Sequence, residues 1–179
     1  MNPTYIQTFS GRRVDIFDPS TWQFQIIDIA HALSNLCRFT GHTKRFYSVA
    51  EHSIHVSTLV PEHLKLVAML HDASEAYLAD IPRPIKQHGS FYSYRQIERD
   101  LTTMILKQWT WFTELPKQVH DADMAVLSIE AKILMGNCHD WPGIMQDTSG
   151  VDININCWTP EQARKKFLTR FAELESVTR

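Results

Sequence analysis

The chain has 179 residues, and this length predicts one domain, residues 1–179, with a sizeable hydrophobic core. Hydrophobic residues make up 44% of the sequence and charged residues 21%, which is typical of a chain that folds. The formal net charge is −2 with histidine neutral, which disfavours a general nucleic-acid binder, because such proteins carry basic stripes. A small anionic ligand is still allowed, since a few local Arg and Lys side chains suffice to bind it.

The cysteines and the hydropathy pattern indicate the compartment. Cys37, Cys138 and Cys157 show no CxxC spacing, and their odd number favours reduced thiols. No signal peptide opens the sequence, and no apolar run reaches the roughly 18 residues of a membrane span. We therefore expect a cytoplasmic protein that does not interact with a membrane.

The first 42 residues predict a hairpin and a helix. Residues 5–16 alternate in side-chain character around a possible turn at Ser10-Gly11, which predicts a small β-hairpin. Apolar residues at spacings of three and four up to Cys37 then predict a helix that begins near Asp28 or slightly before it. Residues 38–42 are interpreted as its exit loop.

The next segment predicts two helices on either side of Pro61. Ser48 and Glu51 have the spacing of a capping box, so a helix is expected from there to about Val60. A second helix is expected over residues 66–77, followed by a proline-rich loop at 81–86.

The C-terminal half predicts two long helices and an irregular segment. The first helix covers residues 93–109, with Ser93 and Gln96 as a second capping box. The other covers residues 116–135 and stops at Gly136, and the polar residues 137–156 then predict an irregular loop.

A last helix follows Thr159, which is placed to cap it, with Pro160 at its first position and Gln162 completing the cap. Taken together, these elements predict an all-α fold with a small N-terminal β-hairpin.

An adjacent His71 and Asp72 follow an apolar run, and burying such groups without partners costs on the order of several kcal/mol. His52 lies nine residues before Pro61 and His71 ten after it, so an antiparallel helix pair would bring the two imidazoles level. Asp72 can reach the same point from the same helix. Two imidazoles and a carboxylate predict a site for Zn, Mn, Fe, Co or Ni.

A fourth ligand must come from another element. Asp123 is followed by apolar residues within a predicted helix, and Asp121 is its rival. The two lie about 200° apart around a helix, so only one of them can face the site.

Glu75 lies on the same helical face as His71 and Asp72, at spacings of four and three. It is therefore placed to hold a water molecule beside the ion and to take part in general acid–base catalysis.

Each of these residues, taken alone, also has an ordinary structural interpretation. His52 could be a surface or capping residue, His71-Asp72 a buried hydrogen-bonded pair, and Asp123 a carboxylate near a helix start. The joint pattern is what predicts a metal site.

The sequence resembles the HD-domain metal-dependent phosphohydrolase superfamily, whose ligands follow an H…HD…D pattern. The matching stretches are CRF at 37–39, SVAEHS at 48–53 and HDASEAYLADIPRPIK at 71–86, which resemble the 5′-deoxynucleotidase branch. The fuller pattern from Trp22 through FYSVAEHS is similar to phage deoxynucleotide phosphohydrolases, including a phage dATP triphosphohydrolase. The resemblance covers about residues 15 to 135 and implies the HD-domain helical fold.

The resemblance implies a role for each matching residue. The metal ligands are His52, His71, Asp72 and Asp123. The catalytic residues are Glu75, beside the attacking water, and Asp80, near the sugar. The substrate-binding residues are Trp22, Phe24, Arg38, Phe39, Arg83, Pro84 and Lys86.

Within that substrate-binding set, Arg38 matches a phosphate-binding arginine, and Phe39 stands where the deoxynucleotidases carry a tryptophan. Arg83 and Lys86 are candidates for the distal phosphates, although both could be solvated loop charges. Trp22 and Phe24 are candidates to stack on the base against Pro84, although Trp22 could equally cover the core.

The function that the resemblance implies is metal-dependent hydrolysis of a deoxynucleotide phosphate, with dATP triphosphohydrolase favoured. The alternatives are a 5′-deoxynucleotidase acting on monophosphates and a non-catalytic nucleotide-sensing module. The cofactor is a divalent transition metal (Co, Mn, Zn, Fe or Ni), and an additional Mg is allowed. The partners expected are a small-molecule deoxynucleotide, no polynucleotide, and further copies of the chain in a dimer or ring. The compartment expected is the cytoplasm of a bacterium or of a phage-infected host.

Overall fold

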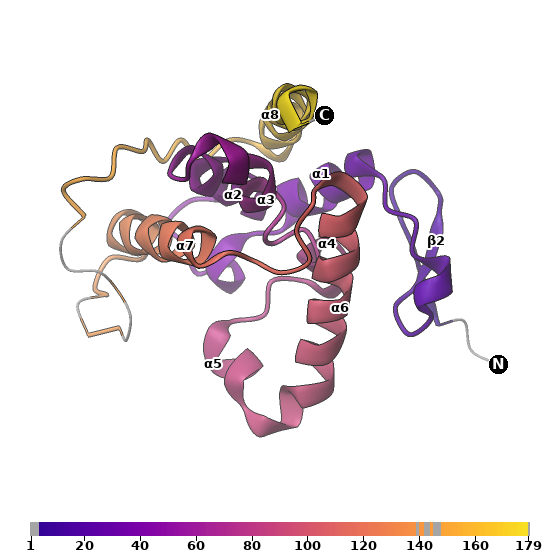
Figure 1. Ribbon diagram of the computed structural model, residues 1–179. Helices are drawn as coiled ribbons and strands as arrows, with labels where there is room; N and C mark the ends of the chain where they lie inside the picture. Colours follow the sequence, from indigo (N-terminus) through magenta and orange to yellow (C-terminus); the bar gives the residue numbers. More distant parts are fainter. Residues whose placement is uncertain (1–3, 139, 142–143, 145–147, 179) are drawn as a thin grey trace.

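The computed structural model describes residues 4–138, 140–141, 144 and 148–178. These residues form helices joined by short turns, together with one two-stranded antiparallel sheet near the N-terminus (Figure 1). The predicted all-α fold with a small N-terminal β-hairpin is therefore confirmed.

The hairpin pairs β1 (Tyr5–Gln7) with β2 (Arg13–Asp15), in a register that places Ile6 opposite Val14. Its turn is held against the first helix, because Ser10 donates from its backbone N–H and its hydroxyl to the Asp28 carboxylate at 2.6 and 2.8 Å. The hairpin is thus attached to the helical body at its turn.

Helix α1 (Ile26–Asn35) begins ahead of Asp28, within the predicted margin. The predicted exit loop contains the 3₁₀ helix η2 (Arg38–Gly41), in which Phe39 and Thr40 have φ of 53° and 55°. Left-handed backbone at two non-glycine residues is strained, and such strain is frequent beside functional sites.

Helix α2 (Val49–Thr58) starts as predicted, since the Ser48 hydroxyl accepts the Glu51 N–H at 3.1 Å. The prediction that the Glu51 side chain completes the capping box is wrong. The Glu51 carboxylate accepts backbone N–H groups of Asn156, Cys157 and Trp158 at 2.7, 3.0 and 2.7 Å. Three backbone donors stabilise this buried charge better than one N-cap amide would.

The single helix predicted over 66–77 is wrong, because the chain forms two shorter helices there. After the 3₁₀ helix η3 (Glu62–Leu64), α3 covers Lys65–Met69 and α4 covers Glu75–Leu78. Between them the hydrogen bonds tighten to 3₁₀ spacing, as in Ala73 N–H to Leu70 C=O at 3.0 Å.

The proline-rich stretch predicted as a loop contains helix α5 (Arg83–Gln87). Pro84 is tolerated because the first turn of a helix needs no N–H donor. The 3₁₀ helix η4 (Gly89–Phe91) leads directly into α6 (Tyr92–Trp109), which has no side-chain cap. The capping box predicted at Ser93 is therefore wrong.

Helix α7 (Lys117–Glu130) continues into one π-helical turn, η5 (Ala131–Met135), and ends at Gly136 with φ of 89°. The described residues of the predicted 137–156 loop form no helix or strand, and the rest of that segment lies outside the described residues. Helix α8 (Pro160–Thr178) carries the predicted capping box, with both bonds formed between Thr159 and Gln162.

Helix α2 occupies the centre of the fold, where it packs against α1, α3, α7 and α8 (Figure 1). Helix α8 contributes apolar side chains to this core, including Phe167 and Leu174. The three cysteines are free thiols. Among the described residues, we find no helix with both the length and the apolar character that a bilayer span requires.

Candidate metal centre and adjoining cavity

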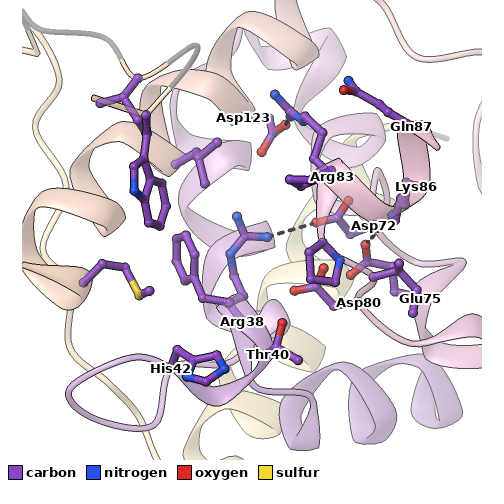
Figure 2. Close-up of a pocket in the computed structure, with 18 residues that line it drawn as sticks. Arg38, Thr40, His42, Asp72, Glu75, Asp80, Arg83, Lys86, Gln87 and Asp123 are labelled. Carbon is purple, nitrogen blue, oxygen red and sulfur yellow. Dashed lines mark hydrogen bonds and ion pairs between the residues drawn. The ribbon is translucent and has the colours of Figure 1, made fainter. Parts of the chain in front are cut away.

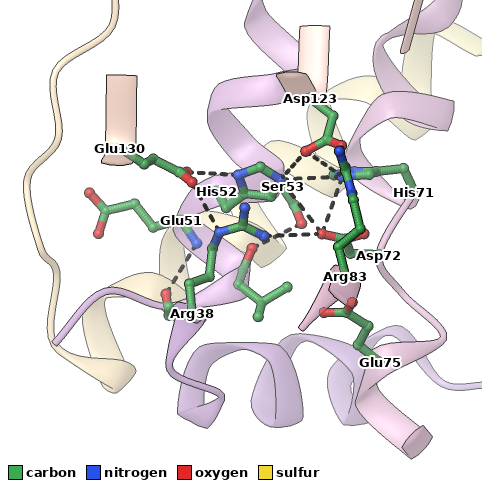
Figure 3. A network of polar contacts seen from close by, with 12 residues as sticks. Arg38, Glu51, His52, Ser53, His71, Asp72, Glu75, Arg83, Asp123 and Glu130 are labelled. Atoms are coloured by element: carbon green, nitrogen blue, oxygen red, sulfur yellow. Dashed lines mark hydrogen bonds and ion pairs between the residues drawn. The ribbon is translucent and has the colours of Figure 1, made fainter. Parts of the chain in front are cut away.

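Three predicted ligands converge beside the central helix (Figure 3). His52 Nε2 lies 3.3 Å from His71 Nε2, and Asp72 Oδ2 lies 3.6 Å from the first nitrogen and 3.2 Å from the second. All three ligand atoms fall within 4.8 Å of one another, so His52, His71 and Asp72 form a buried group that can hold a metal ion.

The route by which these residues meet differs from the one predicted. His52 lies on α2 as expected, but His71 and Asp72 lie in the turn between α3 and α4. The turn allows two adjacent residues to point to the same place, which a regular helix does not, because neighbours there diverge by about 100°.

Asp123 of α7 closes the group from the far side. Its Oδ1 lies 3.2 Å from His52 Nε2 and 4.0 Å from His71 Nε2. Its rival Asp121 faces outward, where both carboxylate oxygens accept from Lys117 Nζ. Helical phase allows only one of the two aspartates to face the site, and in the structure that residue is Asp123.

The remaining ring nitrogen of each histidine has an acceptor. His52 Nδ1 lies 2.7 Å from Glu130 Oε1, and His71 Nδ1 lies 2.7 Å from the Ala68 carbonyl oxygen. Since a carboxylate and a carbonyl only accept, each Nδ1 carries a hydrogen. In the neutral ring this leaves the Nε2 lone pairs of both histidines directed at the same point, the arrangement that a metal ion requires.

The charges around the site favour a cation at that point. Burial and the Arg38 guanidinium lower the pKa of His52, but Glu130 and Asp123 outweigh them and raise it to about 10. Burial raises the pKa of Asp123, but the His52 hydrogen bond and charge outweigh it and hold that pKa at about 2. Two carboxylates therefore hold a positive charge at His52 Nε2, which a proton or a metal ion can supply.

The donor set fits a divalent ion. Two imidazole nitrogens and two carboxylate oxygens suit Zn, Mn, Fe, Co or Ni better than Mg or Ca, which prefer oxygen alone. The site thus fits the class of ion that the sequence predicts.

A cavity of about 720 Å³ opens directly beside the ligands (Figure 2). This volume lies in the range of sites that take small organic ligands. Asp72 and Asp123 line its floor, and Arg38, Arg83 and Lys86 bring three cationic side chains to the same space. A cation site next to basic side chains is suited to a phosphate group, because each positive centre can contact a different phosphate oxygen.

Two further predicted residues, Glu75 and Asp80, line the polar end of this cavity (Figure 2). Burial, with the charges of Asp72 and Asp80, raises the pKa of Glu75 well above its usual range, although Lys86 Nζ lies only 3.1 Å from its Oε1. Burial also raises the pKa of Asp80. A carboxyl group with a raised pKa suits proton transfer near neutral pH.

Apolar side chains also line the cavity. The predicted residues Phe39 and Pro84 line the cavity, and so do residues that the sequence did not single out as binding: Thr40, Leu127, Met135, Trp141 and Ile144. The Phe39 and Trp141 rings are 6.1 Å apart between centroids. Only the fold brings residues near 40 and near 140 together, so no local pattern could have found this wall.

The prediction that Trp22 and Phe24 stack on a base is wrong, because neither side chain lines the cavity. Trp22 is 8% exposed and Phe24 2% exposed, and both belong to the hydrophobic core. The Trp22 indole N–H donates to the Asp15 carbonyl at 2.8 Å, which satisfies its polar group inside the fold. The alternative that Trp22 covers the core is correct.

We therefore expect Trp22→Ala to destabilise the fold and to leave ligand binding unchanged. Truncating a buried tryptophan costs about 3–5 kcal/mol of unfolding free energy. Thermal unfolding checks the first part, and the KM of the folded fraction checks the second. A raised KM with an unchanged Tm would instead support a role for Trp22 in substrate binding.

The sequence analysis did not identify Glu130, a buried carboxylate next to the site. Glu130 is fully buried and accepts from His52 Nδ1, the Tyr47 hydroxyl and Arg38 Nε (Figure 3). One signal could have found it: Glu130 follows Asp123 by seven residues, so the two share a helix face.

The chain is thus an all-α protein whose buried His–Asp cluster, beside a cavity with basic side chains, can hold a divalent metal. No family model matches the chain. It is 33% identical over 175 residues to the uncharacterized protein YfdR of Escherichia coli, with 97% of each chain covered. It is 32% identical over 142 residues to an uncharacterized protein of Rhodobacter capsulatus, covering 74% of this chain and 72% of that one. The chain belongs to the family of these two proteins.

A third relative has a named activity. The chain is 30% identical over 92 residues to a 5′-deoxynucleotidase of Erwinia tasmaniensis, which covers 49% of this chain and 38% of that protein. The similarity is partial, because it spans about half of this chain.

Proposed function

We propose that this protein is a metal-dependent phosphohydrolase of the HD type that acts on deoxynucleotides. The observation that carries the proposal is the meeting of His52, His71, Asp72 and Asp123 beside a cavity lined by basic side chains. The partial similarity to a 5′-deoxynucleotidase supports the substrate class.

Arg38 is the residue that we assign to the phosphate. Its guanidinium is buried, it lines the cavity, and its Nη1 lies 3.6 Å from Asp72 Oδ2, next to the metal site (Figure 2). A planar guanidinium with one edge held by carboxylates can offer its other N–H groups to phosphate oxygens. Arg38 therefore orients the phosphate and stabilises the charge that develops on it.

When bound, a divalent ion supplies Lewis-acid activation of a phosphate oxygen and of the attacking water. Glu75 accepts a proton from that water as its oxygen bonds to phosphorus. The P–O bond to the leaving group breaks, and Glu75 then gives the proton to the departing oxygen. With a monophosphate, the products are a deoxynucleoside and inorganic phosphate. Burial and the charges of Asp72 and Asp80 raise the pKa of Glu75, which makes it a stronger proton acceptor than an ordinary glutamate.

We favour a nucleoside monophosphate as the substrate, which is the 5′-deoxynucleotidase reaction. A triphosphate is the second candidate, because Arg83 and Lys86 add two cations to the cavity beyond Arg38. Lys86 is held by Glu75 and Glu98 at 3.1 and 2.5 Å, so in this arrangement its charge is already partly neutralised. A dATP triphosphohydrolase therefore needs Lys86 to exchange these partners for phosphate.

A substrate panel tests the proposal. The purified protein is incubated with deoxy- and ribonucleoside mono- and triphosphates and Co²⁺, Mn²⁺ or Mg²⁺, and phosphate, pyrophosphate and triphosphate release are measured. We expect activity with Co²⁺ or Mn²⁺, a preference for deoxyribose, and loss of activity in EDTA that added metal restores.

The panel also separates the alternatives. Triphosphate release from dATP would select the triphosphohydrolase, and phosphate release from a deoxynucleoside monophosphate would select the 5′-deoxynucleotidase. Nucleotide binding without hydrolysis under any metal would contradict the proposal and favour a nucleotide-sensing module. Activity on long single-stranded DNA alone would assign a polynucleotide as the substrate instead.

A further inference from the structure

Glu130 lies behind the metal site, with its carboxylate fully buried at the end of α7. Its Oε1 accepts from His52 Nδ1 at 2.7 Å and from the Tyr47 hydroxyl at 2.8 Å, and its Oε2 accepts from Arg38 Nε at 3.0 Å. These three donors come from segments that are 78 to 92 residues away in the sequence. A fully buried charge with three donors is well satisfied, so it is not an accident of packing.

The two ends of this carboxylate face different halves of the site (Figure 3). Through Oε1 it fixes the ring of His52, whose opposite nitrogen points at His71 and Asp123. Through Oε2 it fixes the Nε edge of Arg38, whose Nη1 end reaches Asp72 and the cavity.

We propose that Glu130 is a positioning residue that sets the metal-binding edge of His52 and the phosphate-binding edge of Arg38 together. This inference rests on the proposed function. It assigns to one buried carboxylate the alignment of the metal with the phosphate. A single carboxylate can do this because its two oxygens are rigidly linked, so that a shift of one moves the other.

Glutamine at this position cannot make the same contacts. If its carbonyl oxygen faces His52, its NH₂ group faces Arg38 Nε–H, and two donors meet. If the amide is reversed, the NH₂ group faces His52 Nδ1, which then has to be an acceptor. A neutral His52 would then carry its hydrogen on Nε2, where the metal ligand lone pair is needed. Either orientation impairs one half of the site.

The experiment compares Glu130→Gln with wild type by titrating the metal-free proteins with Mn²⁺ or Co²⁺ in a calorimeter. We expect the metal affinity of the variant to fall about 10- to 100-fold, the usual effect of removing such a partner. In the loaded enzyme we also expect a higher KM and a lower kcat, since both halves of the site are affected.

Glu51→Gln is the matched control. Glu51 is also a fully buried glutamate next to His52 in sequence, but its carboxylate binds backbone N–H groups at 156–158. We expect this variant to lower the Tm and to leave the metal affinity within about twofold of wild type. A merely structural Glu130 would behave in the same way as Glu51.

A measurement on the wild type keeps the inference testable if Glu130→Gln does not fold. In the Zn²⁺-loaded protein, ¹⁵N NMR of the imidazoles is expected to show His52 protonated at Nδ1, and a hydrogen on Nε2 would overturn the inference. Wild-type protein that binds no divalent metal would contradict the proposed function itself. Wild-type binding that Glu130→Gln matches would overturn only the role of Glu130.

Discussion

Replacing Asp72 with asparagine is expected to abolish both metal binding and hydrolysis. Asp72 Oδ2 lies within 3.6 Å of both histidine Nε2 atoms and of Arg38 Nη1, so it contacts both the metal site and the phosphate-binding side. Asparagine has nearly the same shape but lacks the negative charge that a divalent ion requires. We expect activity below about 0.1% of wild type, a loss on the order of 4 kcal/mol in transition-state stabilisation.

Metal content after dialysis and phosphate release measure this effect, with circular dichroism as the check that the variant is folded. Asp121→Asn is the control, because Asp121 is on the same helix as the ligand Asp123 but forms only an exposed ion pair with Lys117. Such pairs contribute about 0–1 kcal/mol, so the control should retain its metal and its activity. Hydrolysis by Asp72→Asn at the wild-type rate would refute the site.

Glu75→Gln is expected to separate metal binding from catalysis. Glu75 lines the cavity but does not belong to the ligand group, so the metal affinity should stay within about twofold of wild type. Loss of the group that accepts the proton should lower kcat by about 10²- to 10⁴-fold. Calorimetry with Mn²⁺ and steady-state kinetics measure the two quantities.

The pH profile gives a second signature of the same variant. A base works only when it is deprotonated, so kcat/KM of the wild type should fall as pH decreases through the pKa of Glu75. Burial places that pKa above the ordinary 4.5 of a glutamate. In Glu75→Gln the acidic limb due to this group should disappear.

Glu98→Gln is the matched control for Glu75. Both carboxylates hold Lys86 Nζ, at 3.1 and 2.5 Å, but only Glu75 is among the residues that line the cavity. If Glu75 acts only by holding Lys86, the two variants should lose kcat equally. If it accepts the proton, Glu98→Gln should retain kcat within a few-fold.

The sequence by itself determined the secondary structure wherever the cause was local. Helical spacing of apolar residues, Ser48 as a helix cap and the Thr159–Gln162 capping box all depend on neighbours within one or two turns. The same locality explains why the candidate ligands could be named, since His71-Asp72 stands out as a polar pair after an apolar run. The single-domain organisation and the identity of the metal stay predictions.

Tertiary structure alone decided how the polar side chains are paired. A carboxylate at Glu51 can cap its own helix or bind backbone 105 residues away, and the nearby sequence does not distinguish the two. The same holds for Glu130, whose partners lie 78 to 92 residues upstream.

Tertiary structure also decided which aromatic residues face the ligand. Trp22 and Phe39 are similar in character, yet the first lies in the core and the second lines the cavity. The physical reason is that backbone propensities act between close neighbours in the chain. Burial and hydrogen-bond satisfaction, in contrast, depend on whichever segments the whole fold brings together.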